Sequence, residues 1–189
     1  MHLVPSPSQT IGPFFHFALT TDPAQGRLAE AAAKGEHIRL ACRVLDGDGA
    51  LVDDAMIELW QADAGGNYNH PDDTDKAADP AFRGFGRLAT NPEGACVFET
   101  VRPGRVPGGG GKLQAPHVNV SIFARGLLNR LATRIYFADD PANAQDPVLA
   151  LAPEDRRDTL MAHPDPERRG VWNFDIRLSG ERETVFFDV

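Results

Sequence analysis

The chain has 189 residues, 42% of them hydrophobic, with 27 acidic against 19 basic side chains and a net charge of −8. A chain of this length can bury one sizeable core, and its acidic balance disfavours nucleic acids and anionic membranes as partners. No run of 18 apolar residues occurs, and the N-terminus lacks the apolar segment of a secretory signal. We therefore expect a soluble, cytoplasmic protein in which Cys42 and Cys96 are buried free thiols.

Residues 1–36 are predicted to be an N-terminal arm followed by a short helix. Four prolines and glycines among the first 13 residues disfavour a regular helix over residues 1–22. The apolar segment Phe14–Leu19 predicts that this extended arm packs on another surface. Residues 24–34 follow Asp22 and Pro23 and end before a glycine, so the sequence predicts a capped helix there.

Residues 37–189 are predicted to form a β-sandwich, which makes the fold all-β and the chain a single domain overall. Alternation begins at residue 37 and places Ile38, Leu40, Cys42 and Val44 on one face. Turn-forming residues separate most of the later apolar segments. The predicted strands are residues 37–46, 55–62, 83–89, 95–101, 117–124, 133–137, 171–178 and 184–189. A short peripheral helix is predicted over residues 154–163.

Two long loops, residues 63–82 and 103–116, lie next to the side chains with the most evident chemistry. Loops of this length are uncommon in compact domains unless they are functional or disordered. The first loop contains Tyr68, which could bind a hard cation such as Fe(III) as a phenolate. The second ends before His117, which shares a strand face with Asn119. Asparagine is a poor ligand beside imidazole, so the pair alone is weak evidence for a metal site.

Each of these residues also has a purely structural interpretation. Tyr68 could pack its ring over the loop, and His117 could be a hydrogen-bonded histidine at the start of a strand. Tyr136 is flanked by strand formers and is predicted to be structural. The acidic run at residues 72–75 lacks the spacing of a calcium-binding loop, so a solvated loop is expected.

Taken together, the motifs give the chain a resemblance to the intradiol ring-cleavage dioxygenases. The resemblance covers nearly the whole chain and is carried by the order of the motifs, since no single motif is specific. The matching segments are Ser8–Phe14 (SQTIGPF), Leu59–Ala64 (LWQADA), Gly66–Tyr68 (GNY), Arg83–Arg87 (RGFGR), Arg102–Gly104 (RPG), Ala115–His117 (APH) and Phe174–Leu178 (FDIRL).

The resemblance is strongest to family members built from two homologous subunits, and it implies a β-sandwich fold. Such members use O₂ and non-haem Fe(III) to open the ring of 3,4-dihydroxybenzoate to 3-carboxy-cis,cis-muconate in the β-ketoadipate pathway. Two tyrosines and two histidines of the catalytic beta subunit hold the iron, and alpha and beta subunits assemble into a large symmetric oligomer. These properties are expectations for this chain, including its place in aromatic catabolism.

The resemblance places the four iron ligands at Tyr68, Val106, His117 and Asn119, so two of the four donors are missing. Fe(III) needs anionic oxygen ligands, and valine cannot coordinate a metal. Tyr68 and His117 are therefore expected to be a remnant that binds no metal. This loss matches the alpha subunit, so no catalytic residue and no iron are expected in this chain alone.

The resemblance also implies that an alpha subunit helps to wall the substrate pocket of its beta partner. The residues that match are Thr10, Gly12 and Pro13 of the arm, together with Arg125. A guanidinium suits an aromatic carboxylate, although Arg125 could equally form an ordinary salt bridge and Pro13 could simply stop the arm. Two other functions stay open: a non-catalytic scaffold or binding sandwich, and an enzyme with an altered metal site using Tyr68, His117 and either His70 or an aspartate of residues 72–75.

Overall fold

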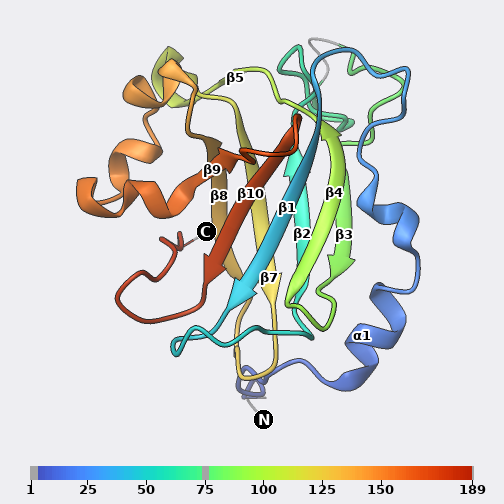
Figure 1. Cartoon of the computed structure of the whole chain (residues 1–189), viewed down its shortest axis with the longest axis vertical. Helices are drawn as coiled ribbons and strands as arrows, with labels where there is room; N and C mark the ends of the chain where they lie inside the picture. Colours follow the sequence, from blue (N-terminus) through green and yellow to red (C-terminus); the bar gives the residue numbers. More distant parts are fainter. Residues whose placement is uncertain (1–3, 74–76, 189) are drawn as a thin grey trace.

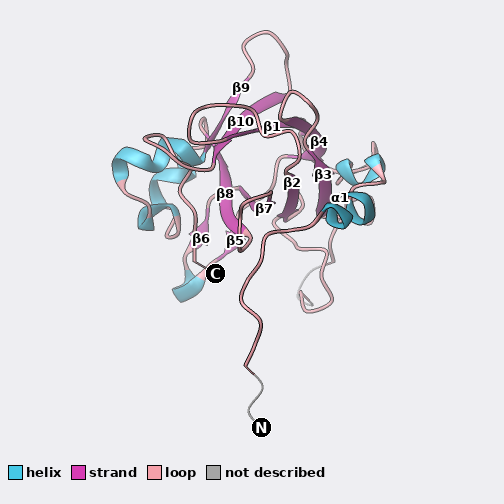
Figure 2. Ribbon diagram, turned by 90° about the horizontal axis from the view of Figure 1, so that it is seen from below, coloured by secondary structure: helices cyan, strands magenta, loops and turns pink. Residues whose placement is uncertain are grey.

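Eight strands form one continuous sheet that bends into two facing layers (Figure 1). The computed structural model describes residues 4–73 and 77–188, without the side chain of residue 16. In spatial order the strands are β3 (Phe85–Ala89), β2 (Met56–Gln61), β7 (His117–Phe123), β8 (Leu131–Phe137), β9 (Met161–Pro164), β10 (Val171–Arg177), β1 (His37–Leu45) and β4 (Ala95–Val101). The first four make one layer and the last three the other, and the short β9 connects them (Figure 2). The all-β sandwich is thereby confirmed.

The core lies between the layers and follows the alternation of the sequence. Ile38, Leu40, Cys42 and Val44 of β1 are all buried, as expected. Facing them from the other layer are apolar side chains of β2, β7 and β8. Burying a side chain of this size stabilises the fold by about 1.5–3 kcal/mol, so the sheet faces hold the two layers together.

The N-terminal region differs from the prediction in two places. Pro13–Leu19 form helix α1, although the prolines and glycines were expected to exclude one. A proline is tolerated in the first turn of a helix, because its missing N–H has no partner there anyway. The predicted helix over residues 24–34 is also wrong. Asp22 caps only a short 3-10 turn, η1 (Pro23–Gly26), after which Arg27 and Ala29 form bridges to Glu99 and Phe82.

The C-terminal region was predicted in part. The segment expected as a helix is η5 (Glu154–Leu160), a 3-10 helix, but strand β9 begins directly after it. The strand predicted over residues 184–189 is not formed: residues 184–188 make one isolated bridge, and the hydroxyls of Thr133 and Thr184 add hydrogen bonds to Val185 and Arg177. Five short elements were not predicted: strands β5 (Val106–Pro107) and β6 (Leu113–Gln114), and 3-10 helices η2 (Gly109–Gly111), η3 (Pro141–Gln145) and η4 (Leu149–Leu151).

Cys42 of β1 lies directly opposite Cys96 of β4 in the antiparallel register. Both thiols are buried and free, as expected. Within the described ranges, no helix has the length and apolar character needed to cross a membrane.

Candidate functional site

The two long loops pack against each other at the end of the sandwich where β2 ends and β7 begins. Gly66 of the first loop has a φ of 80°, and a Cβ there would come within 2.2 Å of the Arg105 carbonyl oxygen. Only glycine accepts both this backbone conformation and this close approach. The contact places the loop of Tyr68 beside Val106.

Tyr68 lies on Trp60 of β2, with ring centroids 5.8 Å apart and an interplanar angle of 11°. Its backbone N–H donates to Asp73 at 2.9 Å, which fixes the loop. Burial raises the pKa of the Tyr68 phenol, while a hydrogen bond with Asn119 and the charge of Arg134 partly oppose this. Asn119 therefore engages the phenol that the resemblance assigns to a metal.

His117 is buried at the start of β7, with 3% of its surface exposed. Its Nδ1 lies 2.8 Å from the Ala115 carbonyl oxygen, so that nitrogen carries the proton when the ring is neutral. Burial, together with the charge of Arg134, lowers the His117 pKa to about 4. The Nε2 atom is buried and has no hydrogen-bond partner among the described residues. The ring is thus neutral and oriented as a metal-binding imidazole would be.

The remaining two positions do not supply metal donors. Val106 is 3% exposed in β5, where it pairs with Gln114 of β6. Asn119 lies opposite Arg134 in the β7–β8 register. The Arg134 guanidinium donates to the side chain of Gln114 at 2.6 Å, which places it near the β5–β6 pair that contains Val106.

Arg134 was not singled out from the sequence, yet it acts on every titratable ring of the cluster. Its charge lowers the pKa values of Tyr68, His117 and Tyr136 relative to what burial alone would give. The signal was present in the alternation of β8, which puts Arg134 and Tyr136 on one face. A fixed cation at this place opposes the binding of a second, trivalent one.

A cavity of about 790 Å³ opens beside this cluster, with Trp60, Tyr68, His70, Val106 and Pro107 among its lining residues. One phenol with a raised pKa, one imidazole and a neighbouring guanidinium do not fit Fe(III), which needs several anionic donors. Within residues 4–73 and 77–188, no three side chains of the types His, Cys, Asp or Glu come together in a way that could hold a metal ion. His70 contacts Asp72 at 3.7 Å, and residues 74 and 75 of the acidic run lie outside the described residues.

A buried carboxylate, that of Asp146, accepts hydrogen bonds from the backbone just before β7. Asp146 is 1% exposed, and its Oδ2 accepts the Ala115 N–H at 2.7 Å. Its Oδ1 accepts the backbone N–H groups of Val148 and Leu149 and the hydroxyl of Tyr136. Tyr136 is therefore structural, as expected.

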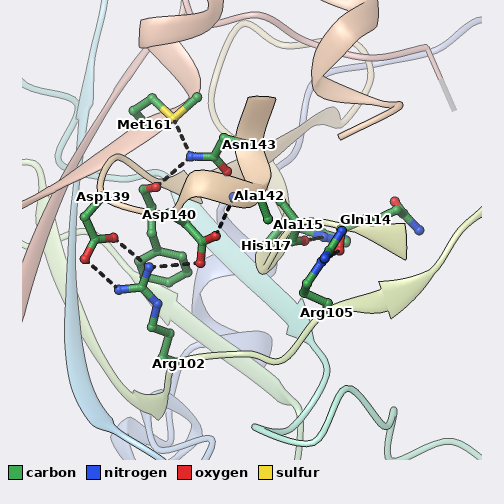
Figure 3. Close-up of polar contacts among 11 residues, drawn as sticks. Arg102, Arg105, Gln114, Ala115, His117, Asp139, Asp140, Ala142, Asn143 and Met161 are labelled. Carbon is green, nitrogen blue, oxygen red and sulfur yellow. Dashed lines mark hydrogen bonds and ion pairs between the residues drawn. The ribbon is translucent and has the colours of Figure 1, made fainter. Parts of the chain in front are cut away.

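The Arg102-Pro103-Gly104 motif anchors the second loop (Figure 3). The Arg102 guanidinium donates to Asp139 at 2.6 Å and to Asp140 at 3.2 Å. It also lies over the rings of Phe137 and Trp172, at 4.7 and 5.1 Å from their centroids. This contact holds the strand end from which the loop leaves for Val106.

The four residues expected to serve a partner's pocket come together at another place in the structure. The Thr10 hydroxyl accepts the backbone N–H of Gly126 at 2.8 Å, which ties the arm to the residue after Arg125. Gly12, Pro13 and Arg125 line a cavity of about 260 Å³. Arg125 forms an ion pair with Asp54 across this cavity.

The arm cavity lies just past the last residue of β7, whereas the Tyr68–His117 cluster lies at its first residue. Figure 1 shows the course of β7 between these two ends of the sandwich. His117 opens the strand and Phe123 closes it, so six residue steps of about 3.3 Å separate the two ends by roughly 20 Å. One small aromatic substrate cannot contact both places in a single chain.

Comparison with known proteins relates the whole chain to one group of enzymes. A family model described as "Dioxygenase" matches residues 11–180. The chain is 43% identical to the protocatechuate 3,4-dioxygenase alpha chain of Burkholderia cepacia, over 97% of both chains. It is 44% identical to the alpha chain of Pseudomonas putida, over 97% of this chain and 96% of that one. Identity to the Burkholderia cepacia beta chain is 35%, over 94% of this chain and 77% of that one.

Solved structures agree in fold. An intradiol ring-cleavage dioxygenase from Tetranychus urticae superposes with a TM-score of 0.65 at 20% identity, over 93% of this chain and 94% of that one. A dioxygenase domain from Streptomyces sp. SirexAA-E gives a TM-score of 0.64 at 24% identity, over 94% and 99% of the two chains.

Proposed function

Since this chain belongs to the intradiol ring-cleavage dioxygenase family, we propose that it is the alpha subunit of a protocatechuate 3,4-dioxygenase. The reaction of the assembled enzyme is the cleavage of 3,4-dihydroxybenzoate by O₂ between its two hydroxyls, giving 3-carboxy-cis,cis-muconate. The observation that carries the assignment is the pair of positions Val106 and Asn119, where this chain lacks two donors that a catalytic chain of the family needs.

The family is iron-dependent, and we propose that a homologous beta subunit holds the Fe(III). The donor set of this chain does not fit the ion, because Arg134 lies near the two remaining donors, Tyr68 and His117. Asn119 acts on the phenol within the chain and lowers its pKa, which partly opposes the effect of burial. Tyr68 and His117 thus serve the fold here, as a stacked ring and as a buried strand-end histidine.

The contribution of this chain to the shared site is proposed to come from its arm. Gly12 and Pro13 carry little side-chain bulk, so the backbone of the arm can close one side of a neighbouring pocket and exclude water. Arg125 carries a permanent positive charge, which suits the carboxylate of 3,4-dihydroxybenzoate. Thr10 fixes the arm in this position through its hydrogen bond to Gly126.

We further propose one domain, with an arm over residues 1–36 and a sandwich over residues 37–189, in a large symmetric alpha–beta oligomer. The cytoplasm is the proposed compartment, because its reducing conditions suit the free thiols of Cys42 and Cys96.

The test is expression of the chain alone and together with its beta partner, followed by metal analysis and an assay of ring cleavage. We expect iron and activity only in the mixed assembly. Stoichiometric iron in the lone chain, with a visible phenolate-to-Fe(III) band and turnover, would overturn the proposal and favour the altered metal site.

The scaffold alternative makes a different prediction. If the chain only supports the assembly, replacing Pro13 or Arg125 leaves the KM for 3,4-dihydroxybenzoate unchanged. If it walls the pocket, Arg125→Gln raises that KM, while assembly measured by size-exclusion chromatography stays the same.

A further inference from the structure

The ion pair between Asp54 and Arg125 has a specific geometry. Asp54 Oδ2 engages Nε of Arg125, on the side edge of the guanidinium. Arg125 has 76% of its side chain exposed and Asp54 has 29%. Among residues 4–73 and 77–188, Arg125 has no other recorded partner for its side chain. The terminal edge, formed by Nη1 and Nη2, is therefore available.

This arrangement leaves room on the guanidinium for a second carboxylate. Arginine presents five N–H donors in a planar fork, and its terminal edge matches the two oxygens of one carboxylate. The ion pair with Asp54 restricts the rotamers of Arg125 and leaves the terminal edge of the guanidinium for an incoming ligand. A lone arginine on a flexible stem would have to lose that freedom on binding.

The sheet places the two residues so that the pairing is built in. Met56 of β2 lies opposite Phe123 of β7 in the antiparallel register. Asp54 lies two positions before Met56, and Arg125 lies two positions after Phe123. The two backbones therefore leave the sheet side by side. Both side chains line the arm cavity together with Gly12 and Pro13.

We propose that Asp54 is a positioning residue that acts through Arg125 to orient it toward the carboxylate of an aromatic acid. The inference rests on the proposed function, since the substrate is bound in a site completed by the beta subunit. Asp54 itself does not touch the substrate. It favours carboxylated over uncarboxylated diols by presenting a preoriented cation.

The test compares variants of the chain coexpressed with the beta subunit, using 3,4-dihydroxybenzoate and catechol, which has the same ring diol without a carboxylate. Asp54→Asn is expected to raise the KM for 3,4-dihydroxybenzoate about 3- to 10-fold, the effect of freeing one rotamer-rich side chain, with kcat within about 2-fold. The KM for catechol should not change. Asp54→Glu should restore part of the loss, and the exposed neighbour variant Asp53→Asn should behave as the unmodified enzyme.

The fold is expected to survive these changes, because exposed ion pairs contribute little to stability. In an Arg125→Gln background, Asp54→Asn should add no further effect. The inference is overturned if Asp54→Asn leaves the KM for 3,4-dihydroxybenzoate unchanged, alters both substrates equally, or still acts in the Arg125→Gln background. A wrong proposed function would give a different result: the unmodified chain would form no active assembly with the beta subunit.

Discussion

Replacing His117 with glutamine is expected to alter how stability depends on pH. In the folded chain the pKa of His117 is lowered to about 4, mainly by burial. In the unfolded chain it returns to the ordinary value of about 6.5. The unfolded state therefore binds a proton in the window between these values while the folded state does not. The stability that His117 contributes is present above about pH 6.5 and is lost as the pH falls toward 4.

The size of this loss follows from the two pKa values. Their difference corresponds to about 3 kcal/mol at the acid limit, and about 2 kcal/mol of it is lost between pH 7.5 and 5.0. Solvent screens the charge on His117 only weakly, because the ring is almost completely buried. Other groups titrate over the same window, but their contribution is common to the parent chain and the variant.

The measurement is urea unfolding of the chelator-treated chain, followed by intrinsic fluorescence at pH 7.5 and 5.0. The parent should lose about 2 kcal/mol more than His117→Gln over this interval. His163→Gln, which removes an exposed histidine, should match the parent. Equal losses in the parent and in His117→Gln would refute the neutral, buried imidazole.

Three further results are expected. Asp146→Ala removes the acceptor of four hydrogen bonds, three of them buried, and should lower the free energy of unfolding by about 3–5 kcal/mol, measured in urea. A variant carrying Val106→Tyr and Asn119→His should gain little iron by metal analysis, whereas adding Arg134→Gln should raise the iron content, because a fixed cation is removed. Deleting residues 1–13 should leave the far-ultraviolet circular dichroism unchanged but impair pairing with the beta subunit or turnover.

Each result has a control or a contrary outcome. Asp48→Ala, at an exposed aspartate, should change stability by less than about 0.5 kcal/mol. Full iron occupancy without the arginine substitution would show that Arg134 is not the obstacle. Unchanged assembly and turnover after the deletion would remove the arm from the proposed site.

Strands of the sheet could be predicted where apolar and polar residues alternate every two positions. Burial alternates along most of β1, so its buried face was identified correctly from the sequence. The predicted helix over residues 24–34 failed because backbone pairing with Glu99 and Phe82 outweighs helix propensity. Strand β9 was missed since it is only four residues long and joins the layers by parallel and antiparallel neighbours.

The residues of the candidate site could be located from the sequence, but the charged side chains around them could not. Motif order located Tyr68 and His117, and the structure adds that burial shifts the pKa of both rings. Arg134 was missed because its neighbours Asn119 and Gln114 lie on other strands, so the alternation of β8 alone does not show that Arg134 faces the site. Asp54 was missed for a similar reason, since its partner Arg125 is distant in the chain and adjacent only through the β2–β7 register.

The opposed thiols of β1 and β4 give the chain an internal reporter of unfolding. Burial raises the pKa of Cys42 well above its ordinary value and that of Cys96 to about 12. Only thiolates react readily with disulfide reagents, so neither sulfur can be labelled while the strands stay paired. The rate at which a coloured thiol reagent is consumed by the native chain therefore counts the opening events of the sheet itself, without any added probe.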